Sequence, residues 1–94
     1  RMLGTPDFMA PEQARDATRA DIRADIYGLG CTLYYLLTGR PPFAAASLYE
    51  LLEQHQHADA ERLDRVRPDV PAELAAVVAR MMAKDPARRY QTPA

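Results

Sequence analysis

Residues 21–39 read Asp-Ile-Arg-Ala-Asp-Ile-Tyr-Gly-Leu-Gly-Cys-Thr-Leu-Tyr-Tyr-Leu-Leu-Thr-Gly, and this stretch decides the fold. It predicts a helix over about residues 22–37, because Asp21 is a good N-cap and Thr38-Gly39 before the Pro41-Pro42 pair is a strong stop. From Ile26 to Gly39 no charged residue interrupts it. A helix that is apolar all round is expected to be buried on every side, so we predict that it forms the centre of the fold. Gly28 and Gly30 each cost roughly 1 kcal/mol against Ala inside a helix, which indicates that a neighbour packs closely there.

Two amphipathic helices are predicted downstream. Ser47 and Glu50 form a capping box that starts a helix over about residues 47–56, with an apolar stripe of Leu48, Leu51, Leu52 and His55. Pro71 is expected at the first position of a helix over about residues 71–83. Its apolar stripe consists of Leu74, Val77, Val78, Met81 and Met82. The charged residues 57–70 are expected to form a connecting loop.

The N-terminal residues 1–20 carry Gly4, Pro6 and Pro11 at close spacing, which favours an extended, ordered loop. No strand-like alternation stands out, so the predicted fold class is all-α: an apolar central helix, two amphipathic helices and an N-terminal loop. The 94 residues suffice for one small domain, here a single partial domain over residues 1–94.

The composition excludes several functions. Thirteen acidic and twelve basic residues nearly cancel, so no nucleic-acid or membrane-surface partner is indicated. Cys31, the only cysteine, excludes an intrachain disulfide and is interpreted as a small core residue. His55 and His57 are two residues apart and point to different helix faces, so no metal site is expected.

Four motifs in order resemble those of protein kinases and cover nearly the whole chain. Gly4-Thr5-Pro6-Asp7-Phe8-Met9-Ala10-Pro11-Glu12 resembles the end of an activation segment, with Ala10-Pro11-Glu12 as the A-P-E motif. Asp25 to Gly30 resembles the helix F motif. Leu36 to Phe43 resembles the helix F exit of bacterial serine/threonine kinases. Asp85-Pro86-Ala87-Arg88-Arg89-Tyr90 is similar to the D-P-x-x-R segment that precedes the final helix.

The chain is therefore identified as a member of the bacterial, eukaryotic-like (Hanks-type) serine/threonine protein kinases. The resemblance implies a fragment of the C-terminal lobe, from the A-P-E region through helix H. In these terms residues 1–20 end the activation segment and form the substrate-pocket loop. Residues 21–43 are helix F and its exit, residues 47–57 are helix G, and residues 71–94 are helix H with the D-P-x-x-R segment.

The resemblance also implies roles for single residues. Thr5 would hydrogen-bond the catalytic Asp and a Lys of the catalytic loop. Phe8, Met9 and Ala10 would line the pocket for the substrate residue after the phosphorylated one. Phe8 stands where the family usually has Tyr or another aromatic residue.

Three further residues would be structural in this resemblance. Glu12 and Arg89 would form a buried ion pair, with Arg88 as the alternative partner. Asp25 would anchor the catalytic loop on the central helix. Helix G would be a docking surface for substrates and regulators, although an ordinary solvated amphipathic helix explains its sequence equally well.

Phosphoryl transfer needs a Gly-rich loop, a strand Lys, a catalytic-loop Asp and Asn, and a D-F-G Asp, none of which is in these residues. We therefore expect no catalytic residue and no cofactor in this segment, and no activity from it alone. The parent would use ATP and Mg²⁺ to phosphorylate serine or threonine of protein substrates. We expect it to be cytoplasmic, or to be the cytoplasmic domain of a membrane-anchored protein.

Two alternatives stay open. A pseudokinase-derived helical scaffold would bind partners through helix G without catalysis. A self-standing helical interaction domain would close its core without a large exposed apolar patch. For the isolated segment we expect a homodimer or a domain-swapped oligomer, because the central helix would present apolar surface to water.

Overall fold

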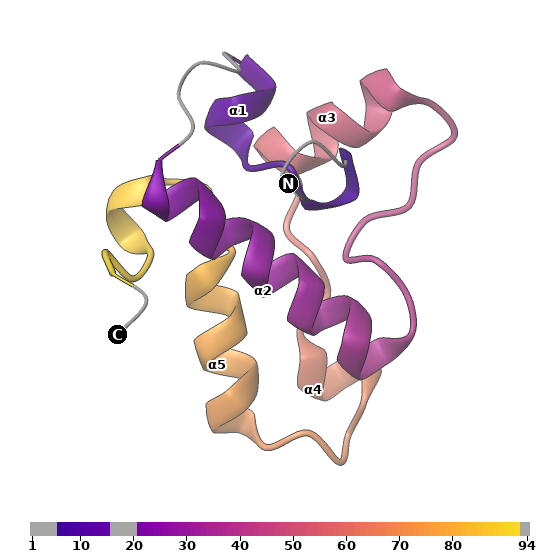
Figure 1. The fold of residues 1–94 in the computed structure, drawn as a ribbon. Helices are drawn as coiled ribbons and strands as arrows, with labels where there is room; N and C mark the ends of the chain where they lie inside the picture. The colour runs from indigo at the N-terminus through magenta and orange to yellow at the C-terminus, as the bar shows by residue number, and fades with distance from the viewer. Residues whose placement is uncertain (1–5, 16–20, 93–94) are drawn as a thin grey trace.

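The computed structural model describes residues 6–15 and 21–92, which pack around one central helix, α2 (Figure 1). Short helices lie on both sides of α2, and the described residues contain no strand. The predicted all-α class is therefore confirmed. In chain order the elements are η2 (Pro6–Phe8), α1 (Pro11–Arg15), α2 (Ile22–Thr38), α3 (Leu48–His57), α4 (Leu63–Val66), α5 (Ala72–Met81) and η4 (Pro86–Arg88).

The ends of α2 follow from local chemistry. Asp21 is the N-cap, and its Oδ1 accepts from the backbone N–H groups of Arg23 at 2.9 Å and Ala24 at 3.2 Å. Gly39 adopts the left-handed conformation with φ of 76° and donates its N–H to the Tyr35 carbonyl at 2.7 Å. The predicted bounds of the central helix are confirmed to within one residue.

Two layers cover α2. In Figure 1, α1 and α3 lie on one side, and α4 and α5 lie on the other. η2, α4 and α5 contact α2 directly, while α3 contacts α1 and η2. The closing segment around η4 returns to the N-terminal end of α2 (Figure 1).

The close approach predicted at the glycines of α2 is confirmed at Gly30. A Cβ atom there would lie 2.9 Å from both the Met81 Cβ and the Met82 Cγ. The end of α5 therefore crosses α2 where α2 has no side chain. This contact joins the C-terminal half of the chain to the central helix.

The expectation that α2 is buried on every side is wrong for the described residues. Ile22, Leu29 and Leu36 are spaced by seven residues and therefore share one helix face, and Leu36 is 70% exposed. The described neighbours of α2 cover only its other faces. An apolar stripe thus remains in contact with water.

The second predicted helix is confirmed, with a different detail in its cap. Ser47 Oγ accepts from the Glu50 N–H at 3.1 Å, whereas the Glu50 carboxylate accepts from the Ala46 N–H at 3.4 Å instead of from Ser47. Leu48 and Tyr49 are exposed, and the buried residue of this helix is His55.

The third predicted helix is shorter than expected, because α5 ends at Met81 and Pro71 is its N-cap. Its buried face consists of Ala75, Val78 and Met81, while Leu74 and Val77 are exposed. Burial of Val78 and Met81 from the predicted stripe is therefore confirmed, whereas Ala75, which packs with Tyr34 and Leu63, is buried in place of Leu74 and Val77.

Helical turns also occur where loops were predicted. Residues 57–70 contain α4, whose Leu63 is only 2% exposed and packs with Tyr34, Val70 and Val78. The N-terminal segment contains η2 and α1 rather than an extended loop throughout. These three elements are too short to show a helical period, and tertiary burial of single residues such as Leu63 decides whether they form. In the described ranges no helix is long and apolar enough to cross a membrane.

Candidate functional site

The site begins at the tight turn that starts α1. Gln13 Oε1 accepts from the Ala10 N–H at 3.1 Å, and the Gln13 N–H donates to the Ala10 carbonyl at 3.0 Å. Pro11 occupies the first helical position, where its missing N–H costs nothing. Ala10 and Gln13 are both buried, so this turn is rigidly held.

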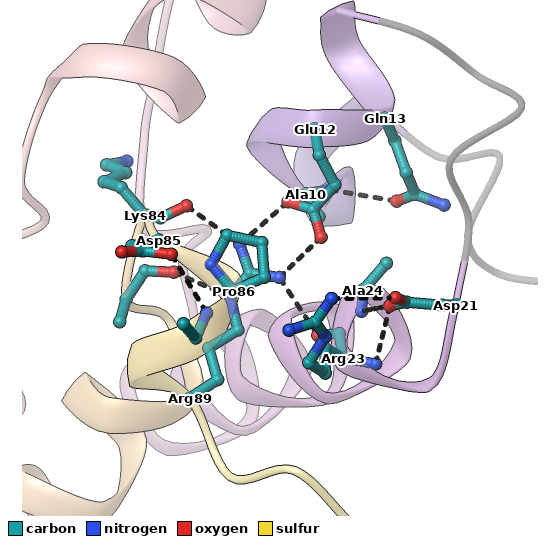
Figure 2. Close-up of polar contacts among 12 residues, drawn as sticks. Ala10, Glu12, Gln13, Asp21, Arg23, Ala24, Lys84, Asp85, Pro86 and Arg89 are labelled. Carbon is teal, nitrogen blue, oxygen red and sulfur yellow. Dashed lines mark hydrogen bonds and ion pairs between the residues drawn. The ribbon is translucent and has the colours of Figure 1, made fainter.

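Glu12 projects from this turn toward the other end of the chain (Figure 2). Its Oε2 accepts from Arg89 Nη1 at 2.7 Å, and its Oε1 accepts from Arg89 Nη2 at 2.9 Å. Both side chains are buried, and the fully buried Arg89 has no exposed surface. Arg88, the alternative partner, is exposed. The geometry is the bidentate pairing that a guanidinium makes with a carboxylate.

Three backbone carbonyls take the remaining donors of Arg89. Nε donates to the Ala83 carbonyl at 2.7 Å, Nη1 to the Arg23 carbonyl at 3.1 Å, and Nη2 to the Lys84 carbonyl at 3.2 Å. A guanidinium has five N–H groups, so all five are used. Arg89 therefore joins α1, the start of α2 and the end of α5 at one point (Figure 2).

The backbone around η4 positions Arg89. Asp85 Oδ1 accepts from the Ala87 N–H at 3.0 Å and caps this turn, after which the Arg89 N–H donates to the Pro86 carbonyl at 3.2 Å. The guanidinium carbon lies 4.9 Å from the centroid of the Tyr27 ring. The helix-capping role of Asp85 was not anticipated, although Asp before Pro is a common start of a turn.

The other predicted site residues lie near this ion pair or outside the described residues. Phe8 and Met9 are half-buried, and Phe8 packs on a buried cluster that contains Ala10, Tyr27 and Cys31. Asp25 lies partly buried in the first turn of α2. Thr5 lies outside the described residues.

His55, which was not among the predicted site residues, lies beside this ion pair through its contact with Tyr27. It is fully buried, and its Nδ1 lies 2.7 Å from the hydroxyl of Tyr27. Its ring meets the rings of Tyr27 and Phe43 edge to face, with centroids 5.7 Å and 5.0 Å apart. The signal in the sequence is its place on the apolar stripe of α3, which is the face that an amphipathic helix buries.

Lys84 also contacts the C-terminal part of α3. Its Nζ donates to the carbonyls of Gln54 at 3.1 Å and His55 at 2.8 Å, and lies 4.6 Å from the centroid of the Phe43 ring. A cation at the C-terminal end of a helix is favourable. Burial lowers the pKa of the Lys84 ammonium to about 8.

Burial also changes the pKa values of two neighbouring groups, the Tyr27 hydroxyl and the Cys31 thiol. It raises the pKa of the Tyr27 hydroxyl, so this hydroxyl stays protonated. It raises the pKa of the Cys31 thiol to about 12, which makes the thiol a poor nucleophile. Within residues 6–15 and 21–92, no three His, Cys, Asp or Glu side chains are grouped so that they could hold a metal ion.

The arrangement defines a class of protein: a helical piece of a kinase C-terminal lobe, with the A-P-E turn and the D-P-x-x-R segment joined across a central helix. The family model described as "Protein kinase domain" matches residues 1–94, and the chain belongs to this family.

Known relatives agree with this class. The chain is 46% identical over 93 residues to the serine/threonine-protein kinase PknB of Mycolicibacterium smegmatis, covering 99% of this chain and 15% of the relative. It is 42% identical over 93 residues to PknB of Mycobacterium tuberculosis, with the same coverage of both chains. It is 41% identical over 95 residues to a probable PknB of Corynebacterium glutamicum, covering 97% of this chain and 15% of that one. The chain therefore spans about 15% of the length of these relatives.

Proposed function

We propose that this chain forms the substrate-side floor of the active site of a serine/threonine protein kinase. One observation carries the proposal: the turn from Ala10 to Gln13 is fixed by the buried Glu12–Arg89 pair, with contacts of 2.7 Å and 2.9 Å. A floor for a peptide must be rigid, because positioning supplies most of the catalysis in phosphoryl transfer.

In this proposal Phe8, Met9 and Ala10 line the pocket for the substrate residue after the phosphorylated one. Phe8 is half-buried, so part of its ring is anchored on the core and part can meet a ligand. Thr5 aligns the catalytic loop, and Asp25 anchors that loop on α2. Glu12 and Arg89 act through structure and touch no substrate.

The segments keep the assignment that the motifs imply. Residues 1–20 are the end of the activation segment, residues 21–43 helix F and its exit, residues 47–57 helix G, and residues 71–94 helix H with the D-P-x-x-R segment. The whole kinase would act on serine or threonine of protein substrates in the cytoplasm, either as a cytoplasmic protein or as the cytoplasmic domain of a membrane-anchored one. No contact of this segment with nucleic acid or membrane is proposed.

ATP and Mg²⁺ belong to the whole kinase in this proposal. The 94 residues contain no Gly-rich loop and no D-F-G sequence, and Lys84, the only lysine, is used at the end of α3. We therefore propose that the chain alone binds no ATP and transfers no phosphate.

A chimaeric kinase tests the proposal. The matching 93-residue segment of Mycolicibacterium smegmatis PknB is replaced by this chain. Phosphate transfer from ATP to a serine- or threonine-containing peptide is then measured. We expect an active chimaera, and we expect Phe8→Ala to raise KM for peptides with a large apolar residue after the phosphorylated one. An exposed-site control, Arg88→Gln, should leave KM unchanged. A chimaera that melts cooperatively but transfers no phosphate would contradict the proposal.

A second candidate is a helical scaffold that binds partners through α3 and has no catalytic parent. It is favoured by Leu48 and Tyr49, because Tyr49 is 73% exposed at the start of α3 while His55 holds the other end in the core. In the same chimaera, this candidate predicts no transfer but retained binding of protein partners that is lost in Tyr49→Ala.

For the isolated chain we also propose self-association into a homodimer or domain-swapped oligomer. The exposed stripe of Ile22, Leu29 and Leu36 supports it, since such apolar surface favours association. Light scattering at high micromolar concentration should give a mass above 10.5 kDa, and Leu36→Lys should reduce it. A monomer at that concentration would contradict this proposal.

A further inference from the structure

A pocket of about 210 Å³ opens between α2, α4 and α5, away from the A-P-E turn. Its lining includes the buried residues Tyr34, Leu63 and Val78 and the half-buried Met82. The residues proposed to contact substrate, Phe8, Met9 and Ala10, do not line it. The pocket is therefore separate from the proposed substrate floor.

Lys84 also lines this pocket. An ammonium has three N–H groups, and two of them go to the carbonyls of Gln54 and His55. Among the described residues, no ion pair includes Lys84. No hydrogen bond among the described residues takes the third N–H, and the ammonium also lies 4.6 Å from the centroid of the Phe43 ring, which lines the same pocket.

The other charges at the pocket narrow the choice of ligand. Glu61 is paired with Arg40 at 3.4 Å, and Arg62 is paired with Asp64 at 3.0 Å. Asp59 is exposed on the lining, and its negative charge acts on Lys84. The negative charge of Asp59 therefore disfavours a ligand that carries more than one negative charge.

We propose that this pocket binds a small amphiphilic monocarboxylate, with its hydrocarbon body on Leu63, Val78 and Met82 and its carboxylate accepting the third N–H of Lys84. The volume suits such a molecule, because a dry apolar cavity of about 150 Å³ already holds benzene. A single ring or a chain of about six carbons therefore fits the space.

Protonation of Lys84 controls this pairing. A neutral amine keeps only two N–H groups, and the Gln54 and His55 carbonyls use both. Because burial lowers the pKa of Lys84 to about 8, carboxylate binding weakens above that pH. The charged or titratable groups that act on Lys84 are Asp59 from the preceding segment, Cys31 from α2, and Arg89.

Titration of hexanoate into the full chain tests the site. Binding is monitored by NMR through the amide resonances of Val78, Met82 and His55. We expect saturable shifts with a Kd in about the millimolar range at pH 6.5. Hexanol, the matched neutral probe, should bind roughly tenfold more weakly. Raising the pH to 9.5 should weaken hexanoate but leave hexanol unchanged. Lys84→Met should remove the preference for hexanoate.

Two variants on α5 control for the pocket itself. Ala79 lines the pocket and is exposed, so Ala79→Phe should block both probes without a cost in the core. Ala76 is exposed on the same helix and does not line the pocket, so Ala76→Phe should bind as the parent chain does. Equal affinity for hexanoate and hexanol, equal binding by both variants, or a spectrum without dispersed amides would overturn the proposal. None of these outcomes depends on phosphate transfer.

Discussion

Arg89 binds the carboxylate of Glu12 through both Nη groups, at 2.7 Å and 2.9 Å, although 77 residues separate the two in the chain. The pair joins the two ends of the described structure, because Glu12 lies in α1 and Arg89 directly follows η4. Its full burial makes each partner dependent on the other.

Removal of the negative charge should therefore be costly. We expect Glu12→Gln to lower the free energy of unfolding by about 3–5 kcal/mol, because it leaves the guanidinium charge buried without a counter-ion. Arg89→Lys should lower the free energy of unfolding by a similar amount, since the three N–H groups of an ammonium cannot replace the five of a guanidinium. Urea unfolding followed by circular dichroism measures both, with exposed Arg88→Lys as the matched control. A loss below about 1 kcal/mol in Glu12→Gln would indicate a solvated pair.

The hydroxyl of Tyr27 is predicted to fix the C-terminal half of α3. Tyr27→Phe removes the 2.7 Å contact to His55 Nδ1 and should cost about 1–3 kcal/mol, because a buried polar atom loses its partner. Tyr49→Phe, on the exposed start of the same helix, should change nothing measurable. Hydrogen exchange should show faster exchange in α3 of Tyr27→Phe, and equal exchange in both variants would contradict this contact.

A side chain at residue 30 should be destabilising despite its better helix propensity. Gly30→Ala gains at most about 1 kcal/mol of propensity. Its Cβ would meet the Met81 Cβ at 2.9 Å, and such overpacking costs about 1–3 kcal/mol. Thermal melting measures the net change in stability that results from these two opposing effects. Adding Met82→Ala should recover only part of the loss, because the Met81 Cβ remains in place, and full recovery would place the clash at Met82 alone.

Cys31 should be unreactive in the folded chain. It is fully buried and its pKa is raised to about 12, so little thiolate exists at pH 8. Alkylation by iodoacetamide should be slow in buffer and as fast as that of free cysteine in denaturing urea. Mass spectrometry gives a clean count, because the chain has one cysteine. Rapid alkylation without urea would show that the core around α2 opens.

Lys84 should make stability increase with pH in one window. Its pKa is lowered from 10.5 to about 8 in the folded chain by burial. Between these values the unfolded chain binds the proton and the folded chain does not, so the contribution of this group rises with pH. The difference in unfolding free energy between the parent chain and Lys84→Met isolates it, since Tyr27 and Cys31 titrate in both. The prediction fails if this difference decreases from pH 7.5 to 10.

The local elements could be predicted because their signals are close together in the sequence. Asp21 and Gly39 end α2 through contacts within four residues, and Ser47 does the same for α3. The kinase motifs were also contiguous, so the class followed from them. The turn α4 was missed because nothing within its four residues distinguishes it from a charged loop.

What the sequence determined by itself was the helical class, the central helix with its caps, and the membership in the protein kinase family. Tertiary structure alone decided which faces are covered. It left Leu36 in contact with water rather than another residue of the apolar central helix, buried His55 on a half-solvated helix, and placed Lys84 at the end of α3. The physical reason is the sequence distance between the interacting residues. Helix caps and apolar periodicity depend on residues about one helical turn away, whereas burial and the His55–Tyr27 contact depend on residues that meet only when the chain has folded.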